Sequence, residues 1–263
     1  MYEQLASAAL YFSLVAYSTS ATLFFVDLAH GQSPTQGNRW ASRVLAVGAG
    51  AHAVQLTLSS LITRTCPVES LPFSLSLSAL VTVASYLLIR RRYRVDAMGV
   101  AVVPIVLSFL VGAQFVGDGP ITPDLPRGLL ALHITSNLLG LGLFLLAGAA
   151  GAFYILQERR LKAKQMPSRL PALDSLDAAE HRLLLVGFPL QTIGAITGAA
   201  LGASGALWIQ LILAYGTWAL IAAVLVLRAW LGWHGRRTAY GTVAGTACVM
   251  LVLMIYILRG VAA

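Results

Sequence analysis

The chain has 263 residues, of which 58% are hydrophobic and only 11% are charged. About a quarter of the residues in a soluble globular domain are charged, so this composition excludes a protein whose whole surface faces water. The formal net charge is +8, but the basic residues stand in short clusters between apolar runs, without interleaved aromatic residues. That pattern favours control of membrane topology over nucleic-acid binding, and we expect no nucleic-acid partner. Cys66 and Cys248 predict neither a disulfide framework nor a redox motif.

Eight apolar runs are long enough to cross a bilayer, which takes about 20 apolar residues. Backbone groups in hydrocarbon must be hydrogen-bonded within their own segment, so each run is expected to be helical. Pro104 and Pro189 are expected to kink the fourth and sixth runs. The sequence therefore predicts an all-α polytopic membrane helix bundle, a single integral membrane domain over residues 1–263. Its spans, in chain order, are residues 5–26, 42–62, 71–89, 97–116, 128–156, 183–202, 207–231 and 238–258.

Basic residues gather in alternate connections between these spans. The first, third, fifth and seventh connections, together with the span ends that adjoin them, hold 15 of the 18 Lys and Arg residues, and only Arg64, Arg127 and Arg259 lie elsewhere. Because Lys and Arg are retained on the cytoplasmic side, these connections should face the cytoplasm and both termini should face outward. We expect a multi-pass protein of a bacterial inner (cytoplasmic) membrane. The longest connection, residues 157–182, is expected to carry a short amphipathic helix on the cytoplasmic surface.

Glycines recur every four residues in two of the spans, which places each set on one helix face. Such faces let helix backbones approach closely in lipid. Packing within the bundle is the expected role, with dimerisation as the alternative. The glycines concerned are Gly194, Gly198 and Gly202 in the sixth span and Gly241 and Gly245 in the eighth.

The sequence contains no P-loop, HExxH, GxSxG or dinucleotide motif, and no pair of carboxylates lies inside a predicted span. We therefore do not expect an enzyme, and histidines are the remaining candidates for chemistry. His52 lies near the middle of the second span, about 15 Å from either end at helical rise, where an ionisable side chain indicates function. It either ligates a metal or hydrogen-bonds to a neighbouring helix.

His133 lies near the predicted outer end of the fifth span. The small residues Gly140 and Gly142 follow it and would leave room for a bulky planar group. A neutral imidazole can ligate a metal through one nitrogen while the other nitrogen donates a hydrogen bond. The other three histidines lie in or beside connections and are expected to be solvated: His30, His181 and His234.

Four parts of the chain, in family order, resemble the cytochrome c assembly family of heme-handling membrane proteins. The likeness runs through most of residues 40–258, and it is closer to the HemX-like members than to the CcsA type. It implies heme as the cofactor and implies that His133 occupies the position of an external histidine of the family. The segments that carry it are Pro67–Leu71, Leu132–Gly140 followed by Tyr154–Lys162, Leu176-Asp177 followed by Gly187–Ala199, and Gly232–Arg237.

The chain also departs from the family pattern. Heme-exporting members carry a tryptophan-rich external segment, which is degenerate here: Trp218 and its surroundings remain, but the acidic, proline and basic residues are gone. Of the family's external histidines, only the position of His133 is retained. His52 is not assigned by the resemblance and rests on its place in the span.

These observations predict a heme-associated membrane protein that acts in cytochrome c assembly or heme handling. His133, and then His52, are the predicted ligands of heme iron. Other cytochrome c maturation proteins are expected partners, besides heme and the lipid bilayer. One alternative is a HemX-like membrane regulator or partner of a cytoplasmic tetrapyrrole-synthesis (heme-synthesis) enzyme, docked through residues 157–182. Another is a small-solute permease, for which the spans offer few polar groups.

Overall fold

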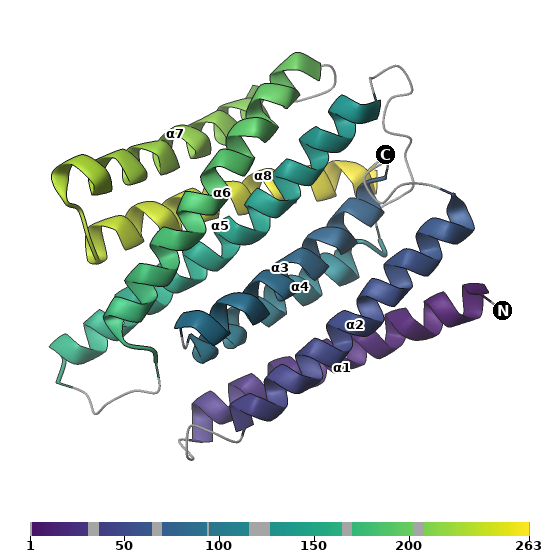
Figure 1. Cartoon of the computed structure of the whole chain (residues 1–263), viewed down its shortest axis with the longest axis horizontal. Helices are drawn as coiled ribbons and strands as arrows, with labels where there is room; N and C mark the ends of the chain where they lie inside the picture. Colours follow the sequence, from purple (N-terminus) through teal and green to yellow (C-terminus); the bar gives the residue numbers. More distant parts are fainter. Residues whose placement is uncertain are drawn as a thin grey trace. The chain divides into compact units, whose positions relative to one another are not determined.

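A computed structural model describes residues 2–30, 37–64, 70–93, 95–115, 127–164, 170–201 and 208–262. Within these ranges every regular element is helical, which confirms the predicted all-α fold (Figure 1). The chain divides into two compact units, Met1–Ile121 and Thr122–Ala263. The elements are α1 (Tyr2–His30), α2 (Gly37–Thr63), α3 (Leu71–Tyr93), the short 3-10 turn η1 (Asp96–Met98), α4 (Gly99–Gly112), α5 (Arg127–Lys162), α6 (Leu173–Leu201), α7 (Trp208–Leu231) and α8 (Arg236–Ala262).

Seven of these helices are long and apolar enough to cross a membrane, and the segment Asp96–Gly112 forms a shorter apolar helix. The predicted polytopic membrane bundle is therefore confirmed. α4 has 14 residues and covers about 21 Å at helical rise, while η1 adds about 6 Å. Together they fall slightly short of a hydrocarbon core of about 30 Å. The sidedness of the termini stays a prediction.

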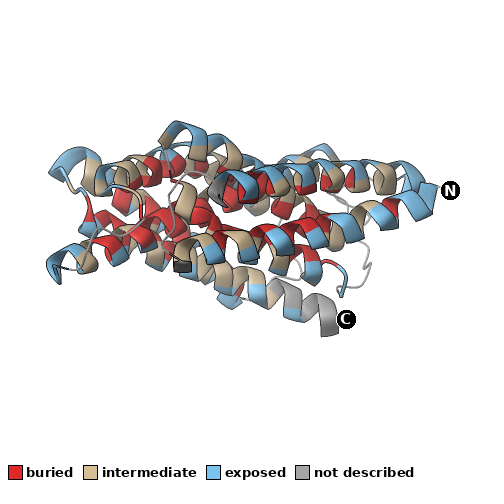
Figure 2. Cartoon of the chain, turned by 90° about the horizontal axis from the view of Figure 1, so that it is seen from below, coloured by how far each residue is buried: buried red, intermediate tan, exposed pale blue. Residues whose placement is uncertain are grey.

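The first unit is a ring of four helices in which α1 contacts α2 and α4, and α3 contacts α2 and α4. Small residues allow the close approaches. A Cβ on Gly99 would lie 2.6 Å from the ring of Phe24, so only glycine lets α4 pack so closely on α1. Phe24 in turn meets Tyr86 of α3 edge-to-face, with ring centroids 6.1 Å apart. Figure 2 shows buried residues along the inward helix faces and exposed residues along the outer faces.

The second unit is a ring of the same kind, in which α5 and α7 each contact α6 and α8. α5 contributes much of the core, including Phe144 and Leu146, which are almost fully buried. The predicted role of the regularly spaced glycines in packing within the chain is confirmed. An added Cβ on each of the four that the structure describes would strike a neighbouring helix. The fifth, Gly202, lies outside the described residues. The pairs are Gly194 with Asn137, Gly198 with His133, Gly241 with Val224 and Gly245 with Ile221.

One prediction about the connection 157–182 is wrong. α5 extends to Lys162 and α6 already begins at Leu173, so the expected surface helix is the first part of α6 itself. No glycine or proline interrupts the chain from Leu173 to Val186, and the helix therefore continues without a break into the apolar run. Leu176 and Glu180 are buried rather than solvated. Residues 165–169 of the connection lie outside the described residues.

The prediction for the three remaining histidines holds in part. His234 lies in the connection between α7 and α8 and is exposed, as expected. His181 is not a loop residue: it lies inside α6, and its Nδ1 atom is buried without a hydrogen-bond partner. His30 is the last residue of α1, and its side chain lies outside the described structure. Pro104 and Pro189 lie inside α4 and α6, where the expected kinks stay predictions.

Candidate functional site

The imidazole of His133 projects from α5 onto the backbone of α6. Its Nδ1 atom lies 2.8 Å from the carbonyl oxygen of Gly194 and 3.3 Å from the hydroxyl of Thr197. A carbonyl oxygen can only accept a hydrogen bond, so this contact requires the proton to be on Nδ1. The lone pair then lies on Nε2. A metal-ligating histidine commonly has this arrangement, in which one nitrogen donates to a backbone carbonyl and the other is free to coordinate.

Asn137, one helical turn further along α5, lies over the same ring. Its Nδ2 atom donates to the backbone oxygen of His133 at 2.8 Å and lies 3.2 Å from Nδ1. Among the described residues, this amide is also the only hydrogen-bonding group near Nε2, at 3.5 Å. Nε2 is therefore the less engaged of the two ring nitrogens, and the ring is only half-buried.

Glycines of α6 decide how closely the ring can approach. A Cβ on Gly198 would lie 2.6 Å from Cε1 of His133, so the imidazole occupies the space that the missing side chain leaves. The expectation that Gly140 leaves room for a planar group is wrong, because the side chain of Gln191 fills that space. A Cβ on Gly140 would lie 2.7 Å from Cγ of Gln191. Gly142 is buried.

His52 has a different environment, in the first unit. It is fully buried. Its Nδ1 lies 3.2 Å from the hydroxyl of Tyr17 on α1, and its Nε2 lies 2.8 Å from the hydroxyl of Ser76 on α3. The rings of Tyr17 and His52 also meet edge-to-face, with centroids 5.9 Å apart. Both ring nitrogens have partners, so coordination of a metal by His52 would require the loss of a hydrogen bond. The geometry favours the alternative in which His52 links three helices.

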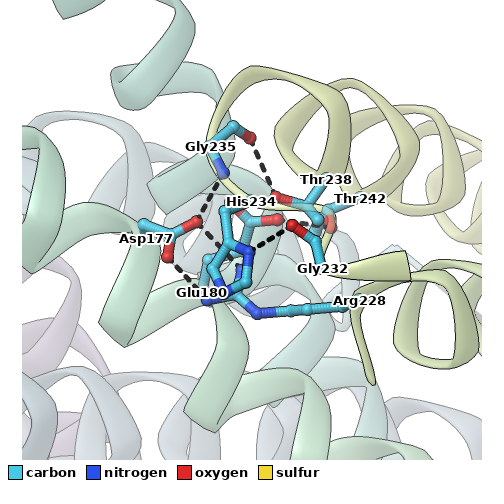
Figure 3. A network of polar contacts seen from close by, with 8 residues as sticks. All are labelled: Asp177, Glu180, Arg228, Gly232, His234, Gly235, Thr238 and Thr242. Carbon is cyan, nitrogen blue, oxygen red and sulfur yellow. Dashed lines mark hydrogen bonds and ion pairs between the residues drawn. The ribbon is translucent and has the colours of Figure 1, made fainter. Parts of the chain in front are cut away.

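A polar cluster joins α6, α7 and α8 at the end where α7 connects to α8 (Figure 3). Asp177 accepts hydrogen bonds from both terminal nitrogens of Arg228, at 2.9 and 2.6 Å, and a third from the backbone N–H of Gly235 at 2.9 Å. This carboxylate therefore ties α6 to the last turn of α7 and to the first residue before α8. The guanidinium and the carboxylate are mostly buried, with side-chain exposures of 10% and 18%.

Glu180, one turn deeper in α6, extends the cluster. It is fully buried, and its Oε1 accepts a hydrogen bond from the hydroxyl of Thr242 on α8 at 2.7 Å. Its Oε2 atom is buried without a partner. Sequence reasoning missed this cluster because it placed Asp177 and Glu180 in a surface connection. Their spacing of three residues puts them on one helix face, and Arg228 ends a neighbouring span, which together could have indicated the pairing.

Trp218, which the resemblance assigned to the degenerate tryptophan-rich segment, lies on α7 against α6. Its Nε1 donates to the hydroxyl of Thr192 at 2.9 Å, and its ring stacks on Phe188 with centroids 5.5 Å apart. Beside it is an apolar hollow of about 230 Å³. The α6 residues of the hollow are on the opposite helix face from Gly194 and Gly198, so His133 does not line it. The lining residues are Thr192, Ala195, Ile196, Ala199, Tyr215 and Trp218.

The described residues contain no cluster of three or more His, Cys, Asp or Glu side chains that could hold a metal ion. A site built from protein ligands alone is therefore not indicated there. Heme iron differs, because the porphyrin supplies four ligands and the protein adds only one or two axial ones. The chemistry of His133, with one fixed N–H and one lone pair, fits that requirement.

The fold defines a polytopic helical membrane protein, in which the Nδ1 atom of His133 is engaged by α6 and Nε2 is the less engaged ring nitrogen. The chain belongs to the cytochrome c assembly protein family, whose sequence pattern matches residues 8–261. This confirms the resemblance found in the sequence.

Individual relatives match over different lengths. Protein HemX of Brevibacillus brevis is 27% identical over 194 residues, which cover 71% of this chain and 70% of that protein. Cytochrome c biogenesis protein CcsA of Synechococcus elongatus is 36% identical over 108 residues, 39% of this chain and 33% of that protein. CcsA of Picosynechococcus is 40% identical over 84 residues, 30% of this chain and 25% of that protein. The chain thus matches about a third or less of these CcsA proteins. No solved structure matches it significantly.

Proposed function

We propose that this chain is a heme-associated membrane protein that acts in cytochrome c assembly or heme handling, with His133 as an axial ligand of heme iron. One observation carries the proposal: Nδ1 of His133 is held by the carbonyl oxygen of Gly194, which leaves the lone pair on Nε2. Membership of the cytochrome c assembly family supplies the class of ligand. When bound, the iron supplies the coordination chemistry, and the chain supplies binding and orientation.

The position of His133 in α5 suits such a role. It lies six residues after Arg127, the first residue of α5, and thus about 9 Å along the helix axis. A planar group held at that depth keeps its apolar rim within the bilayer and its charged propionates near water. Among the described residues, the side chains that hydrogen-bond to the His133 ring are those of Thr197 and Asn137, neither of which is an acid or a base. We therefore propose binding rather than catalysis.

His52 remains the second predicted ligand, but its surroundings support a structural role more strongly. Coordination through Nε2 would break the 2.8 Å contact with Ser76, and coordination through Nδ1 would break the contact with Tyr17. Either change leaves a hydroxyl without its partner inside the bundle. We propose that His52 holds α1, α2 and α3 together.

Absorption spectra of the detergent-purified protein, oxidised and reduced, test the assignment. We expect bound heme in the unaltered protein. His133→Ala should lower the bound heme or change its low-spin spectrum, and added imidazole should partly restore the spectrum by filling the vacant coordination position. His234→Ala is the matched control, because His234 is exposed and its Nδ1 lies 2.6 Å from the carbonyl of Gly232 in its own loop. An identical spectrum for His133→Ala, or a protein that takes up no heme, contradicts the proposal.

A second candidate function is that of a HemX-like membrane partner of a cytoplasmic heme-synthesis enzyme, in a bacterial inner membrane. Exposed cations at the end of α5 favour it, because they could meet an acidic partner surface: Arg159, Lys162 and Lys164 are all exposed. Since α5 and α6 extend into the predicted connection, only residues 163–172 remain as a linker. Replacing them with a Gly/Ser linker of equal length should remove a copurifying enzyme and leave heme content unchanged. Retention of the enzyme refutes docking through this linker.

A further inference from the structure

Two arginines from different helices converge on one tyrosine at the end of the second unit where α5 finishes and α8 begins. Nη2 of Arg159 on α5 lies 3.3 Å from the hydroxyl oxygen of Tyr240, and Nη2 of Arg236 on α8 lies 3.4 Å from the same oxygen. The guanidinium of Arg236 also lies over the Tyr240 ring, with Cζ 5.3 Å from the centroid. A phenol oxygen has two lone pairs and can accept both hydrogen bonds.

This arrangement holds two positive charges close together, and among the described residues only Arg236 has a carboxylate, that of Glu158, within ion-pair distance. The two Nη2 atoms can be no further apart than the sum of their distances to the Tyr240 oxygen, about 7 Å, where guanidinium groups repel each other. Glu158 is the nearby acid, but it is shared: it pairs with Lys162 at 2.7 Å and reaches Nε of Arg236 only at 3.7 Å. Among the described residues, Arg159 donates a hydrogen bond to the Tyr240 hydroxyl and forms no ion pair with a carboxylate.

The surroundings add to the positive charge. Six cations gather where α5 ends and α8 begins, against the single carboxylate of Glu158 on these segments. Trp230, in the last turn of α7 just before the connection to α8, is 86% exposed. Exposed tryptophan and tyrosine side chains lie preferentially at the headgroup level of a bilayer. This end of the unit is therefore expected to lie among lipid headgroups. The six cations are Arg159, Arg160, Lys162, Lys164, Arg236 and Arg237.

We propose that Arg159, Arg236 and Tyr240 form a binding site for the phosphate of an anionic phospholipid headgroup. A phosphate oxygen accepts strong, charge-assisted hydrogen bonds from guanidinium groups, and a tetrahedral phosphate between the two arginines offers a separate oxygen to each. The anion relieves the repulsion between the two guanidiniums. The tyrosine holds both arginines in place before the lipid arrives, and the apolar flanks of α5 and α8 lie beside its acyl chains.

Clusters of Lys and Arg at the cytoplasmic edge of a membrane protein attract anionic lipid in general. The test must therefore distinguish specific binding at this site from attraction by net charge. The full chain is reconstituted in vesicles of equal phosphatidylcholine and phosphatidylglycerol, extracted gently, and examined by native mass spectrometry for retained lipid. The variant Arg159→Gln/Arg236→Gln removes two charges from the site. The control Arg91→Gln/Arg92→Gln removes two charges from the end of α3, where both side chains are exposed.

We expect the unaltered protein to retain phosphatidylglycerol in preference to phosphatidylcholine. The site variant should lose about fivefold or more of that preference, the control variant should keep it, and Tyr240→Phe should reduce it while leaving the charge unchanged. Equal loss in both double variants means that net charge alone attracts the lipid, and it overturns the proposal. Absence of any preference overturns it as well, as does displacement of the lipid by millimolar inorganic phosphate, which would identify a site for the free anion.

Discussion

Replacing Asp177 with Ala should destabilise the second unit more than any change of an exposed charge. The substitution removes three hydrogen bonds at once, two from Arg228 and one from the N–H of Gly235. It also leaves the guanidinium of Arg228, whose side chain is 10% exposed, without a carboxylate. Loss of one partner of a buried ion pair costs about 3–5 kcal/mol. Because the side chain of Asp177 keeps 18% exposure, we expect a value near the lower limit, about 3 kcal/mol.

Thermal unfolding in detergent, followed by circular dichroism, measures this effect. In a protein of this size about 3 kcal/mol corresponds to a fall in Tm of about 6–12 °C. Arg228→Ala should cause a similar fall, and the double variant should be more stable than the sum of the two single effects predicts, because no stranded charge remains. Lys162→Ala is the control: it breaks an ion pair in which Lys162 is 64% exposed, and it should cost less than about 1 kcal/mol.

The reasoning fails if Asp177→Ala lowers Tm no more than Lys162→Ala does. It also fails if the two single effects at Asp177 and Arg228 simply add. Either result would mean that solvent or detergent screens the pair and that α6, α7 and α8 are held together by apolar packing alone.

Other contacts lead to similar tests. Gly148→Ala should lower Tm, because a Cβ at that position collides with a threonine of α8. The control Gly216→Ala should leave Tm unchanged or raise it slightly, since nothing lies within 4 Å of the added atom. Equal effects of the two substitutions would refute the packing argument. Thr242→Val should cost about 1–3 kcal/mol, because it removes the hydrogen-bond partner of the buried Glu180 carboxylate, and an unchanged Tm would show that water replaces it. A reporter that is active only in the cytoplasm should give no signal when fused after Ala263, and a strong signal there would contradict the predicted outward C-terminus.

Much of the fold could be predicted from the sequence, because apolar runs of spanning length indicate helices that are surrounded by lipid. Each of the eight predicted spans overlaps a helix of the structure, although the fourth, 97–116, covers part of η1 and all of α4 and runs past the end of α4 at Gly112. The observed helices are mostly longer, as at α5, which was predicted as 128–156 and extends over Arg127–Lys162. Hydropathy marks only the part of a helix in hydrocarbon, and polar turns continue beyond it. For the same reason hydropathy did not indicate the start of α6, because the first turns of this helix carry charged residues although they pack against neighbouring helices.

The site could be predicted only in part, and the two histidines show why. Each was found from the sequence because an imidazole inside an apolar run is costly unless it has a partner. The sequence could not tell which partner each one has, since Gly194 lies 61 residues from His133 and Ser76 lies 24 residues from His52. It also suggested open space beside Gly140 that Gln191 fills.

Composition and the spacing of apolar and basic residues thus determined by themselves that this chain is a helical membrane protein, and the family motifs placed it among cytochrome c assembly proteins. These properties depend on local energetics, because each span must satisfy its own backbone in lipid. The tertiary structure alone decided that both ring nitrogens of His52 have close partners while Nε2 of His133 is less engaged, and that Asp177 faces Arg228. Those outcomes depend on which helix faces meet, and hydrogen bonds between distant residues form only after the helices have packed.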